Sequence, residues 1–347
     1  MQIFKKYNLT PNKLKLKLNL NIALVGSGKM ANEYAKVIKS FDHNISTIVS
    51  SDNKNKDLLI KNYNIKNNFT SFENSIKNSK NVDAWIICTS WDKLNKYFKL
   101  AIKHKLIFLI EKSIITSSQD LIKINKKISK NEKKNFLISY NRNYYDYIPS
   151  LISLLKNRDI DQISVNMSDP FRETLKKQKK TLKKNLILFI TSHWISLILK
   201  ILKISKNKID IKGYTKFGKK NNLSAKTLIF KIKNKQNTIP LLINLFPNNS
   251  SNTNINFYCK KLHILLSPIE KIKINYDLER IKKFRQNFYK PIYKYSSVQN
   301  AYKPGLRFMY FDFIQACVFK KNSVYGTNID DLIEIYKICE ILDNNKK

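Results

Sequence analysis

The chain has 347 residues, which is more than one hydrophobic core usually serves, so two domains are expected. Lys and Arg number 65 against 25 Asp and Glu, a formal net charge of +40 that would suit a nucleic-acid partner. Lys, Asn and Ile are abundant together along the whole chain, however, and the lysines form no long basic tail. We therefore interpret the charge as a general bias of the composition toward Lys, Asn and Ile, and expect no nucleic-acid partner. The positive charge could still attract anionic substrates to the protein.

Cysteine and histidine are scarce and dispersed. They are Cys88, Cys259, Cys317 and Cys339, and His43, His104, His193 and His263. No C-x-x-C pair or histidine cluster occurs, so the sequence indicates neither a disulfide framework nor a metal site. Free thiols in apolar surroundings are typical of a reducing compartment, and we expect a cytoplasmic protein.

The pattern of apolar residues also bears on membranes. The first twenty residues, a basic extension, contain no continuous apolar run of the secretory type. The most apolar stretch, residues 186–202, is short for a membrane span and includes Ser, His and Trp. We expect it to be a buried helix and predict no membrane association.

From residue 21 to residue 143, apolar strand-like runs alternate with helical patterns. Strands are expected within 21–26, 44–51, 67–70, 82–90, 106–113 and 135–143, and helices within 29–40, 55–63, 71–79, 91–105 and 117–133. Such alternation with short connections is the pattern of a doubly wound parallel α/β sheet, a Rossmann domain.

After residue 143 the sequence pattern changes, and residues 144–347 are expected to form a second, α+β domain. A helix at 145–159 and the apolar helix around His193 accompany strand-like runs separated by turn residues. These runs are 161–170, 208–218, 228–247, 253–261 and 263–277. They predict an open, mainly antiparallel sheet, and residues 304–319 and 329–342 are expected as closing helices.

One short motif points to a ligand. In "VGSGKMA" two of the chain's six glycines, Gly26 and Gly28, stand between an apolar strand and a helix, with Ala31 in the third small position. The G-x-G-x-x-G/A pattern in this context holds a dinucleotide pyrophosphate on the helix N-terminus. The motif therefore predicts that Gly26, Ser27, Gly28, Lys29 and Met30 contact a nicotinamide cofactor; the alternative is a tight turn with no ligand.

The end of the second strand should meet the adenosine ribose. Ser50 and Ser51 stand there in place of the acidic residue that binds NAD, and Asp52, Lys54 and Lys56 follow. Hydroxyls with nearby lysines suit the 2′-phosphate of NADP, whereas Asp52 turned toward the ribose would suit NAD. The cofactor is predicted as NADP or NAD, with a slight preference for NADP.

Glu111 and Lys112 close the strand at 106–113, and the carboxyl ends of strands in an open α/β sheet face the ligand. Lys112 is therefore a candidate for contact with cofactor and substrate, although an ordinary strand-end lysine is the alternative in a lysine-rich chain.

Several segments together resemble one family. "VGSGKMA", "VDAWIICTS", "IEKS", "SYNRNYY", "SHWISLIL" and "KPGLRFMYFDFIQACV" occur in the order found in the Gfo/Idh/MocA family, and the resemblance spans about residue 21 to the C-terminus. It implies a Rossmann domain followed by an open-sheet α/β domain whose far face often makes oligomer contacts. It also implies hydride transfer between NAD(P) and a sugar, cyclitol or sugar nucleotide, and we expect a role in surface-polysaccharide synthesis.

The resemblance assigns roles to individual residues. Glu111, Lys112 and Ser113 correspond to the family's Glu-Lys-Pro motif, so Lys112 is expected to bind the reacting hydroxyl and Glu111 to lie at the cofactor. His193 corresponds to the family's histidine and is the expected general base, with a satisfied core histidine as the alternative. Thr89 and Ser90 match the family's Thr-Pro at the cofactor, and Trp91 follows as a cofactor-packing or lid residue.

The crossover between the domains supplies the other substrate candidates. Asn141, Arg142 and Tyr145 in "NRNYY" are expected to bind sugar hydroxyls or a phosphate, or else simply to link the domains. Further candidates for an anionic group are Arg172, Lys303 and Arg307.

This chain also departs from the family at three positions. Ser113 replaces the proline, and Phe189 and Ser196 stand where carboxylates often flank the histidine. Without those carboxylates the imidazole loses its usual orienting partners. A non-catalytic, nucleotide-sensing or scaffold protein on the same fold is therefore kept as the alternative.

Overall fold

The computed structural model describes residues 19–114, 116–156, 158–168, 187–206, 210–218, 225–233, 238–246, 252–260, 262–268, 271–281, 286–296 and 301–343. Nearly all of the basic extension and Arg172 lie outside these residues. The described chain divides into two units, 19–144 with 301–337, and 145–296 with 338–343. Residues 301–337, expected in the second domain, thus group with the first.

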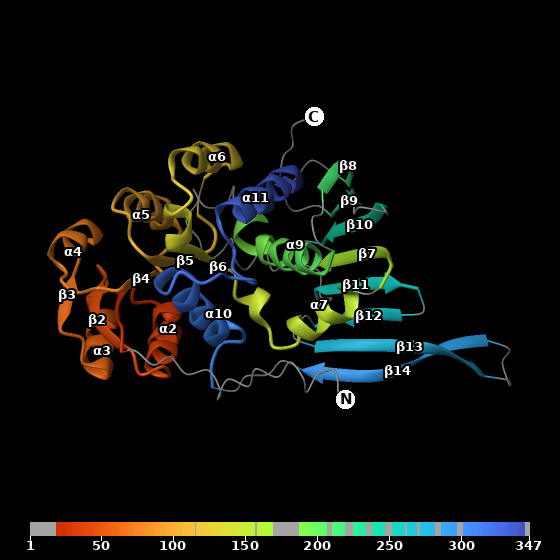
Figure 1. Cartoon of the computed structure of the whole chain (residues 1–347), viewed down its shortest axis with the longest axis horizontal. Helices are drawn as coiled ribbons and strands as arrows, with labels where there is room; N and C mark the ends of the chain where they lie inside the picture. The colour runs from red at the N-terminus through yellow and green to blue at the C-terminus, as the bar shows by residue number, and fades with distance from the viewer. Residues whose placement is uncertain are drawn as a thin grey trace. The chain divides into compact units, whose positions relative to one another are not determined.

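The first unit contains a six-stranded parallel sheet in the order β3-β2-β1-β4-β5-β6 (Figure 1). Its strands are β1 (Asn21–Val25), β2 (Asn44–Val49), β3 (Asn67–Phe69), β4 (Ala84–Ile87), β5 (Phe108–Glu111) and β6 (Phe136–Ser139). The order reverses on either side of β1, which is the doubly wound arrangement expected from the sequence. The apolar strands β1 and β4 are buried almost throughout, as helices on both faces of a parallel sheet require.

Helices connect these strands. They are α2 (Lys29–Lys39), α3 (Asn53–Tyr63), α4 (Phe72–Asn78), α5 (Trp91–Lys103) and α6 (Ser118–Lys127), with 3₁₀ turns at Glu132–Asn135 and Asn141–Tyr144. The side chains of Asp52, Ser71 and Ser117 cap α3, α4 and α6 by accepting a backbone N–H hydrogen bond. Helix α2 begins after Gly28 and has no side-chain cap.

Residues 301–337 complete the core of this unit. Helix α10 (Leu306–Phe313) contacts α2, as Figure 1 shows, and runs into a π-helical turn, Ile314–Val318. Met309, Tyr310 and Phe313 belong to the same buried cluster as Ile38 and Phe41. Apolar spacing at 304–319 predicted the helix, but only the contacts reveal which unit it stabilises.

The second unit contains an eight-stranded sheet in the order β14-β13-β12-β11-β7-β10-β9-β8. Its strands are β7 (Ile160–Met167), β8 (Asp210–Gly218), β9 (Lys226–Lys233), β10 (Thr238–Leu245), β11 (Asn254–Cys259), β12 (Leu262–Leu266), β13 (Lys271–Ile281) and β14 (Gln286–Ser296). Only the β7–β10 pair is parallel, so the predicted mainly antiparallel sheet is confirmed.

Two details differ from the sequence-based expectation. The run 228–247 is two antiparallel strands, β9 and β10. Strand β14 was not expected, because Pro291 weakens its strand pattern; it lies at the edge of the sheet, where a missing backbone N–H is tolerated.

The helices of this unit are α7 (Ile148–Lys156), α9 (Ser192–Lys206), which follows a π-helical turn at Ile187–Thr191, and the end of α11 (Ile329–Asp343). Within the described residues one helix, Ile187–Ser205, is long and apolar enough to cross a membrane by length and composition. Because 78% of the most apolar stretch of this helix is buried inside the protein, it has the character of a core helix, as expected.

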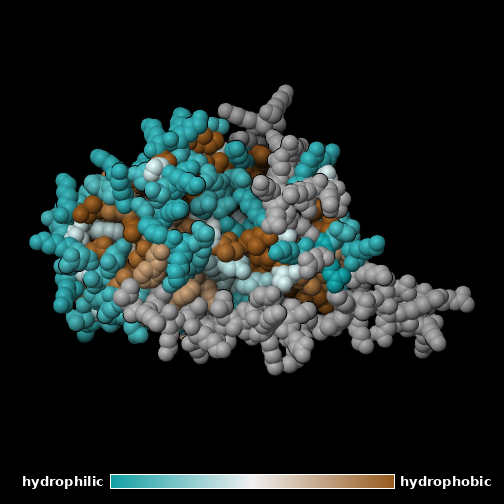
Figure 2. Space-filling model, viewed as in Figure 1, coloured by the Kyte–Doolittle hydropathy of each residue, from teal (hydrophilic) through white to brown (hydrophobic). Residues whose placement is uncertain are grey.

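Few large apolar side chains are exposed among the described residues. Figure 2 shows hydrophilic residues over most of the visible surface of the first unit. Among described residues the large apolar side chains that are exposed are Leu58, Tyr258 and Val324. Tyr258 is the one that lies on the second sheet, in β11.

Candidate functional site

Gly26 is required by the fold itself. Its φ of +124° is strained for any residue with a side chain, and a Cβ atom would lie 2.5 Å from the carbonyl oxygen of Cys88. Its N–H also donates to the carbonyl of Val49 across 2.8 Å. Gly26 therefore allows β1, β2 and β4 to converge at their carboxyl ends.

Gly28 is different, because no protein contact demands a glycine there. Its φ is −76°, an ordinary value, and a Cβ atom would meet no described atom within 4 Å. The first N–H groups of α2 have no side-chain cap, and this turn contains no acidic residue. Open space beside uncapped N–H groups fits the phosphate of a dinucleotide, so the residues present pass this test for the predicted cofactor.

The neighbouring strand end carries a row of hydroxyls. Ser27 and Ser50 share a hydrogen bond of 2.7 Å, and the backbone N–H of Asp52 donates to the Ser50 hydroxyl. Lys93 Nζ, from the first turn of α5, donates to Ser51 Oγ across 3.2 Å. The predicted residues Ser27, Ser50 and Ser51 thus lie together with a lysine that the sequence analysis did not single out.

Asp52 is occupied as the cap of α3. Its two carboxylate oxygens accept from the backbone N–H of Asn55 at 3.2 Å and from the Asn55 side-chain amide at 2.7 Å. These hydrogen bonds lower the pKa of the Asp52 carboxyl group, because they favour its charged form. Of the two lysines that follow, Lys54 is exposed and Lys56 is buried.

The end of β5 places Lys112 against an aromatic ring. Lys112 is 8% exposed, and its Nζ lies 5.7 Å from the ring centroid of Trp91 at the start of α5. This distance allows a cation–π interaction. Lys112 and Trp91 are therefore neighbours, next to Thr89 and the exposed Ser90 at the end of β4.

Glu111 is engaged beside it. Its Oε1 accepts from the hydroxyls of Tyr34 at 2.8 Å and Ser139 at 3.0 Å, and those hydroxyls share a 2.7 Å hydrogen bond. Burial, and then the Glu111 charge, raise the pKa of Tyr34 well above its usual value. Glu111 thus ties the strand end to α2 and β6, a role that spacing along the chain did not indicate.

The turn after Lys112 differs from a proline turn. Ser113 has φ +72°, which a proline ring cannot adopt. The cis peptide bond among the described residues is Ser267–Pro268, so the Lys112–Ser113 bond is trans. The replacement of the family's proline therefore goes with a different backbone conformation at this position.

The crossover residues have structural partners. Asn141 is buried, its side-chain amide donates to the carbonyl of Pro304 at 2.9 Å, and its own carbonyl lies against Gly305. Arg142 is half-buried. Tyr145 is buried, with its ring 5.9 Å from that of Tyr147.

Two further cation candidates separate clearly. Arg307 is buried at the end of α2, where its Nε donates to Ser40 Oγ at 3.1 Å and its guanidinium lies 4.6 Å from the Phe41 ring. Burial lowers the pKa of Arg307. Lys303 is exposed, and its Nζ is 3.1 Å from the sulfur of Met30 in the first turn of α2. Lys303 therefore lies at the predicted phosphate end, and Arg307 at the opposite end.

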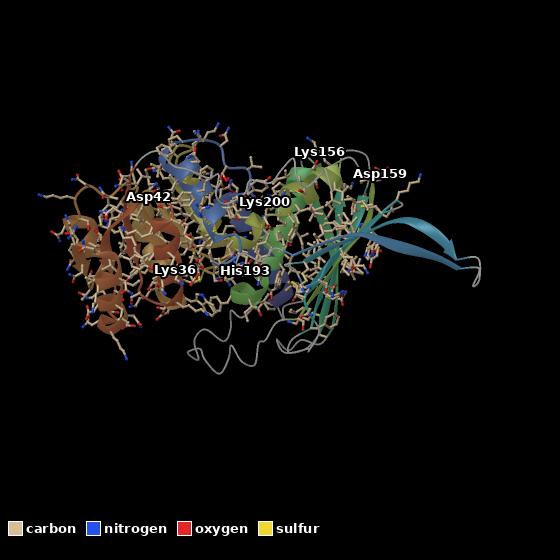
Figure 3. The ribbon with its side chains drawn as sticks, turned by 90° about the horizontal axis from the view of Figure 1, so that it is seen from below. Lys36, Asp42, Lys156, Asp159, His193 and Lys200 are labelled. Carbon is tan, nitrogen blue, oxygen red and sulfur yellow. The ribbon has the colours of Figure 1, made fainter. Side chains whose placement is uncertain are left out.

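His193 lies at the beginning of α9 in the second unit, as labelled in Figure 3. It is half-buried, and Ser196 and Lys200, which follow at helical spacing, place polar groups on the same face. Phe189 is fully buried and Ser196 is 2% exposed. The two positions that carry carboxylates in many family members are thus enclosed here. Within the described residues no group of His, Cys, Asp and Glu could hold a metal ion.

Comparison with known proteins agrees with this architecture. Residues 20–140 match the model of the Gfo/Idh/MocA oxidoreductase family, with its NAD-binding Rossmann fold. The family resemblance expected from the sequence is thereby confirmed, and the matched residues lie within the first unit. Among curated proteins, no sequence matches this chain.

Solved structures extend the fold match over nearly the whole chain. A dehydrogenase from Chromobacterium violaceum superposes with a TM-score of 0.72 at 13% identity, covering 94% of each chain. UDP-N-acetylglucosamine 3-dehydrogenase from Acidithiobacillus ferrooxidans gives 0.69 at 10% identity, covering 93% of this chain and 96% of that one. A super-repressor mutant of Gal80p from Saccharomyces cerevisiae gives 0.71 at 13% identity, covering 94% and 95%. At these identities the likeness establishes the fold.

Proposed function

We propose that the protein is an oxidoreductase that binds a nicotinamide dinucleotide at the turn Gly26–Met30 and acts on a hydroxyl or keto carbon of a sugar or sugar nucleotide. The observation that carries the cofactor is Gly28, which nothing in the described protein requires to be glycine and which leaves open space beside uncapped N–H groups. The family match over residues 20–140 and the dehydrogenase neighbours support the reaction class.

Lys112 is the residue we propose for the proton step. A bound nicotinamide supplies or accepts the hydride, and the substrate hydroxyl must correspondingly lose or regain a proton. Lys112 stands at the carboxyl end of β5, buried beside the Trp91 ring, and its side-chain nitrogen would exchange that proton with the substrate oxygen. Thr89, Ser90 and Trp91 at the end of β4 would contact the cofactor beside it.

His193, Asn141, Arg142 and Tyr145 are proposed as substrate-binding residues, with His193 as a general base. Support for His193 comes from its half-buried position on the polar face of α9. Since it belongs to the second unit and Lys112 to the first, each needs its own test. His193→Asn should lower turnover and leave dinucleotide affinity unchanged.

The cofactor proposal is tested by titrating the protein with NADH and with NADPH while recording tryptophan fluorescence. Trp91, near the expected site, is the natural reporter. Binding of either dinucleotide at micromolar concentration is expected. If neither binds below about millimolar, an affinity near 4 kcal/mol, the cofactor proposal is wrong.

One observation favours a second function. The buried Phe189 and Ser196 occupy the two positions where members of the family often carry carboxylates, and a repressor variant shares the fold. A non-catalytic protein that senses a nucleotide would bind NAD(P)H tightly and reduce no substrate. A panel of UDP-N-acetylglucosamine, other sugar nucleotides and inositols, followed at 340 nm, distinguishes the two functions once binding is established.

We also propose a homo-oligomer formed through the outer face of the second sheet. An asparagine belt, defined as Asn166, Asn244, Asn254, Asn256 and Asn275 with Thr227 and His263, is hydrogen-bonded across β9, β10, β7, β11, β12 and β13. These side chains are uncharged in the neutral form of His263, and burial lowers the pKa of His263. A second copy of a chain with net charge +40 would meet less repulsion at the belt than at Lys231, Lys233 and Lys273, which flank the belt on the same face.

The oligomer is tested by sedimentation. Asn166→Lys adds a charge in the middle of the belt and should shift the protein toward monomer, whereas Lys99→Gln, at an exposed position of α5 in the first unit, should not. We place the protein in the cytoplasm and propose a role in surface-polysaccharide synthesis. Glycosyltransferase or aminotransferase genes beside its own gene would support that role.

A further inference from the structure

We infer that the dinucleotide is NADP and that Lys93 binds its 2′-phosphate together with Ser51. This inference rests on the cofactor site proposed above, which it makes specific. Neither the G-x-G motif nor the family match distinguishes the two dinucleotides.

The first step is the place of Ser51. In a doubly wound sheet the residue that follows the second strand meets the 2′ position of the adenosine ribose, about twenty residues beyond the third small residue of the turn. Ala31 is that third residue, and Ser51 lies in the bend after β2. The Ser27–Ser50 hydrogen bond of 2.7 Å joins this strand end to the glycine turn, so both belong to one surface.

The second step concerns the acidic residue. A site selective for NAD presents a free carboxylate to the ribose hydroxyls, and such a carboxylate repels a 2′-phosphate. Asp52 is the acidic residue at this strand end, and both of its oxygens accept hydrogen bonds from Asn55. If Asp52 turned toward a ribose, α3 would lose its N-terminal cap. The Asp52 carboxylate therefore serves the helix and not the ribose.

The third step is the cation. Lys93 is held at the same edge of the sheet by α5, which follows β4, and its Nζ donates to Ser51 Oγ across 3.2 Å. Among the described ion pairs none involves Lys93. A serine hydroxyl does not neutralise an ammonium charge, whereas a phosphate would accept from both the ammonium and the hydroxyl. Lys54, exposed in the first turn of α3, adds positive charge nearby.

The arrangement as a whole therefore matches an anion more closely than a neutral ribose hydroxyl. Its donors come from two different helical connections, the one after β2 and the one after β4. Because Lys93 is 42 residues from Ser51 in the chain, only the folded sheet brings the ammonium to the hydroxyl.

The experiment compares NADPH with NADH by fluorescence titration of the full chain at low and moderate salt. The wild-type protein should bind NADPH at least tenfold more tightly than NADH. Lys93→Gln should weaken NADPH about tenfold or more and leave NADH unchanged. The matched control is Lys99→Gln, which removes an exposed lysine from the same helix and should change neither affinity.

Two further measurements locate the contact. Adenosine 2′,5′-bisphosphate should lose affinity in the Lys93→Gln protein, whereas 5′-AMP should not. Ser51→Asp should reverse the preference toward NADH, which shows that the variant still folds and binds. If the wild-type protein binds neither dinucleotide, both the cofactor site and this inference fail. If it binds NADH at least as tightly as NADPH, or if Lys93→Gln weakens both equally, the inference is overturned while the cofactor site stands.

Discussion

Tyr34 donates its phenolic hydrogen to Glu111 across 2.8 Å, and so joins the helix that follows the glycine turn to the last residue of β5. The tyrosine is fully buried, and Ser139 at the end of β6 binds both groups. This network holds the strand end that carries Lys112 at a constant position relative to α2. The proposed phosphate-binding helix and the proposed catalytic lysine are therefore parts of one rigid framework.

The network predicts a pH dependence of stability. The pKa of Tyr34 is raised in the folded protein, first by burial and then by the Glu111 charge, above a value of about 10 in the unfolded chain. The contribution of Tyr34 to the free energy of unfolding is therefore fully present below pH about 10. It is lost as the pH rises from there toward the pKa of Tyr34 in the folded protein.

Tyr34→Phe tests this dependence. The variant should be less stable by about 1–2 kcal/mol at pH 8, because the hydrogen bond to Glu111 is lost. Above pH about 10 the difference in stability between the two proteins should narrow. Ionisation of Tyr34 in the unfolded state lowers the free energy of unfolding of the wild-type protein, and the variant has no such group. Urea unfolding at pH 8, 10 and 11 measures both quantities. A difference that stays constant over this range would contradict the interpretation.

The two glycines of the turn should behave oppositely when replaced by alanine. Gly28→Ala introduces a methyl group into open space, so unfolding free energy should change by at most about 1 kcal/mol, while dinucleotide affinity falls at least tenfold. Gly26→Ala meets the Cys88 carbonyl and a positive φ, and should reduce the melting temperature strongly. Calorimetry and fluorescence titration separate the effects; full affinity in Gly28→Ala would remove the main support for the cofactor site.

Lys112→Met should abolish reduction or oxidation of any substrate identified in the panel, and it should leave NADPH affinity within about threefold of wild type. The unbranched apolar side chain fills similar space beside Trp91 but cannot exchange a proton. Single-turnover absorbance at 340 nm measures the chemistry, and fluorescence titration measures binding. Retained turnover would exclude Lys112 as the proton-transfer residue.

Arg307→Ala should destabilise the first unit by about 1–3 kcal/mol, because it removes the hydrogen bonds from the guanidinium to Ser40 and the contact with the Phe41 ring. Dinucleotide affinity should not change. Lys303→Ala is the comparison, since this exposed lysine beside Met30 should affect affinity and spare stability. Thermal unfolding and titration of both variants check the pair; loss of affinity in Arg307→Ala at unchanged stability would restore it as a ligand residue.

Residues close together in the chain were sufficient to predict the class of fold. Buried strands such as β1 and β4 are continuous apolar runs, and helices such as α2 have apolar residues at helical spacing, because burial imposes those periods locally. The two glycines between β1 and α2 predicted a phosphate-binding turn for the same reason, since its conformation depends on adjacent residues. Strand β14 was not predicted, because it contains a proline. A proline is tolerated at the edge of a sheet, but the position of a strand at the edge cannot be read from neighbouring residues in the chain.

The sequence alone thus determined the alternating architecture, the glycine turn and the strand-end position of Lys112. Tertiary structure decided which glycine is needed by the protein and which faces open space, and it brought Lys93 to Ser51 and Tyr34 to Glu111. It also placed Arg307 beside Ser40, 267 residues away in the chain. Ser40 follows the last residue of α2, whereas the predicted phosphate lies at the first turn of that helix. Secondary structure follows from side chains a few positions apart, whereas the partners of a charged group are set by how strands and helices pack.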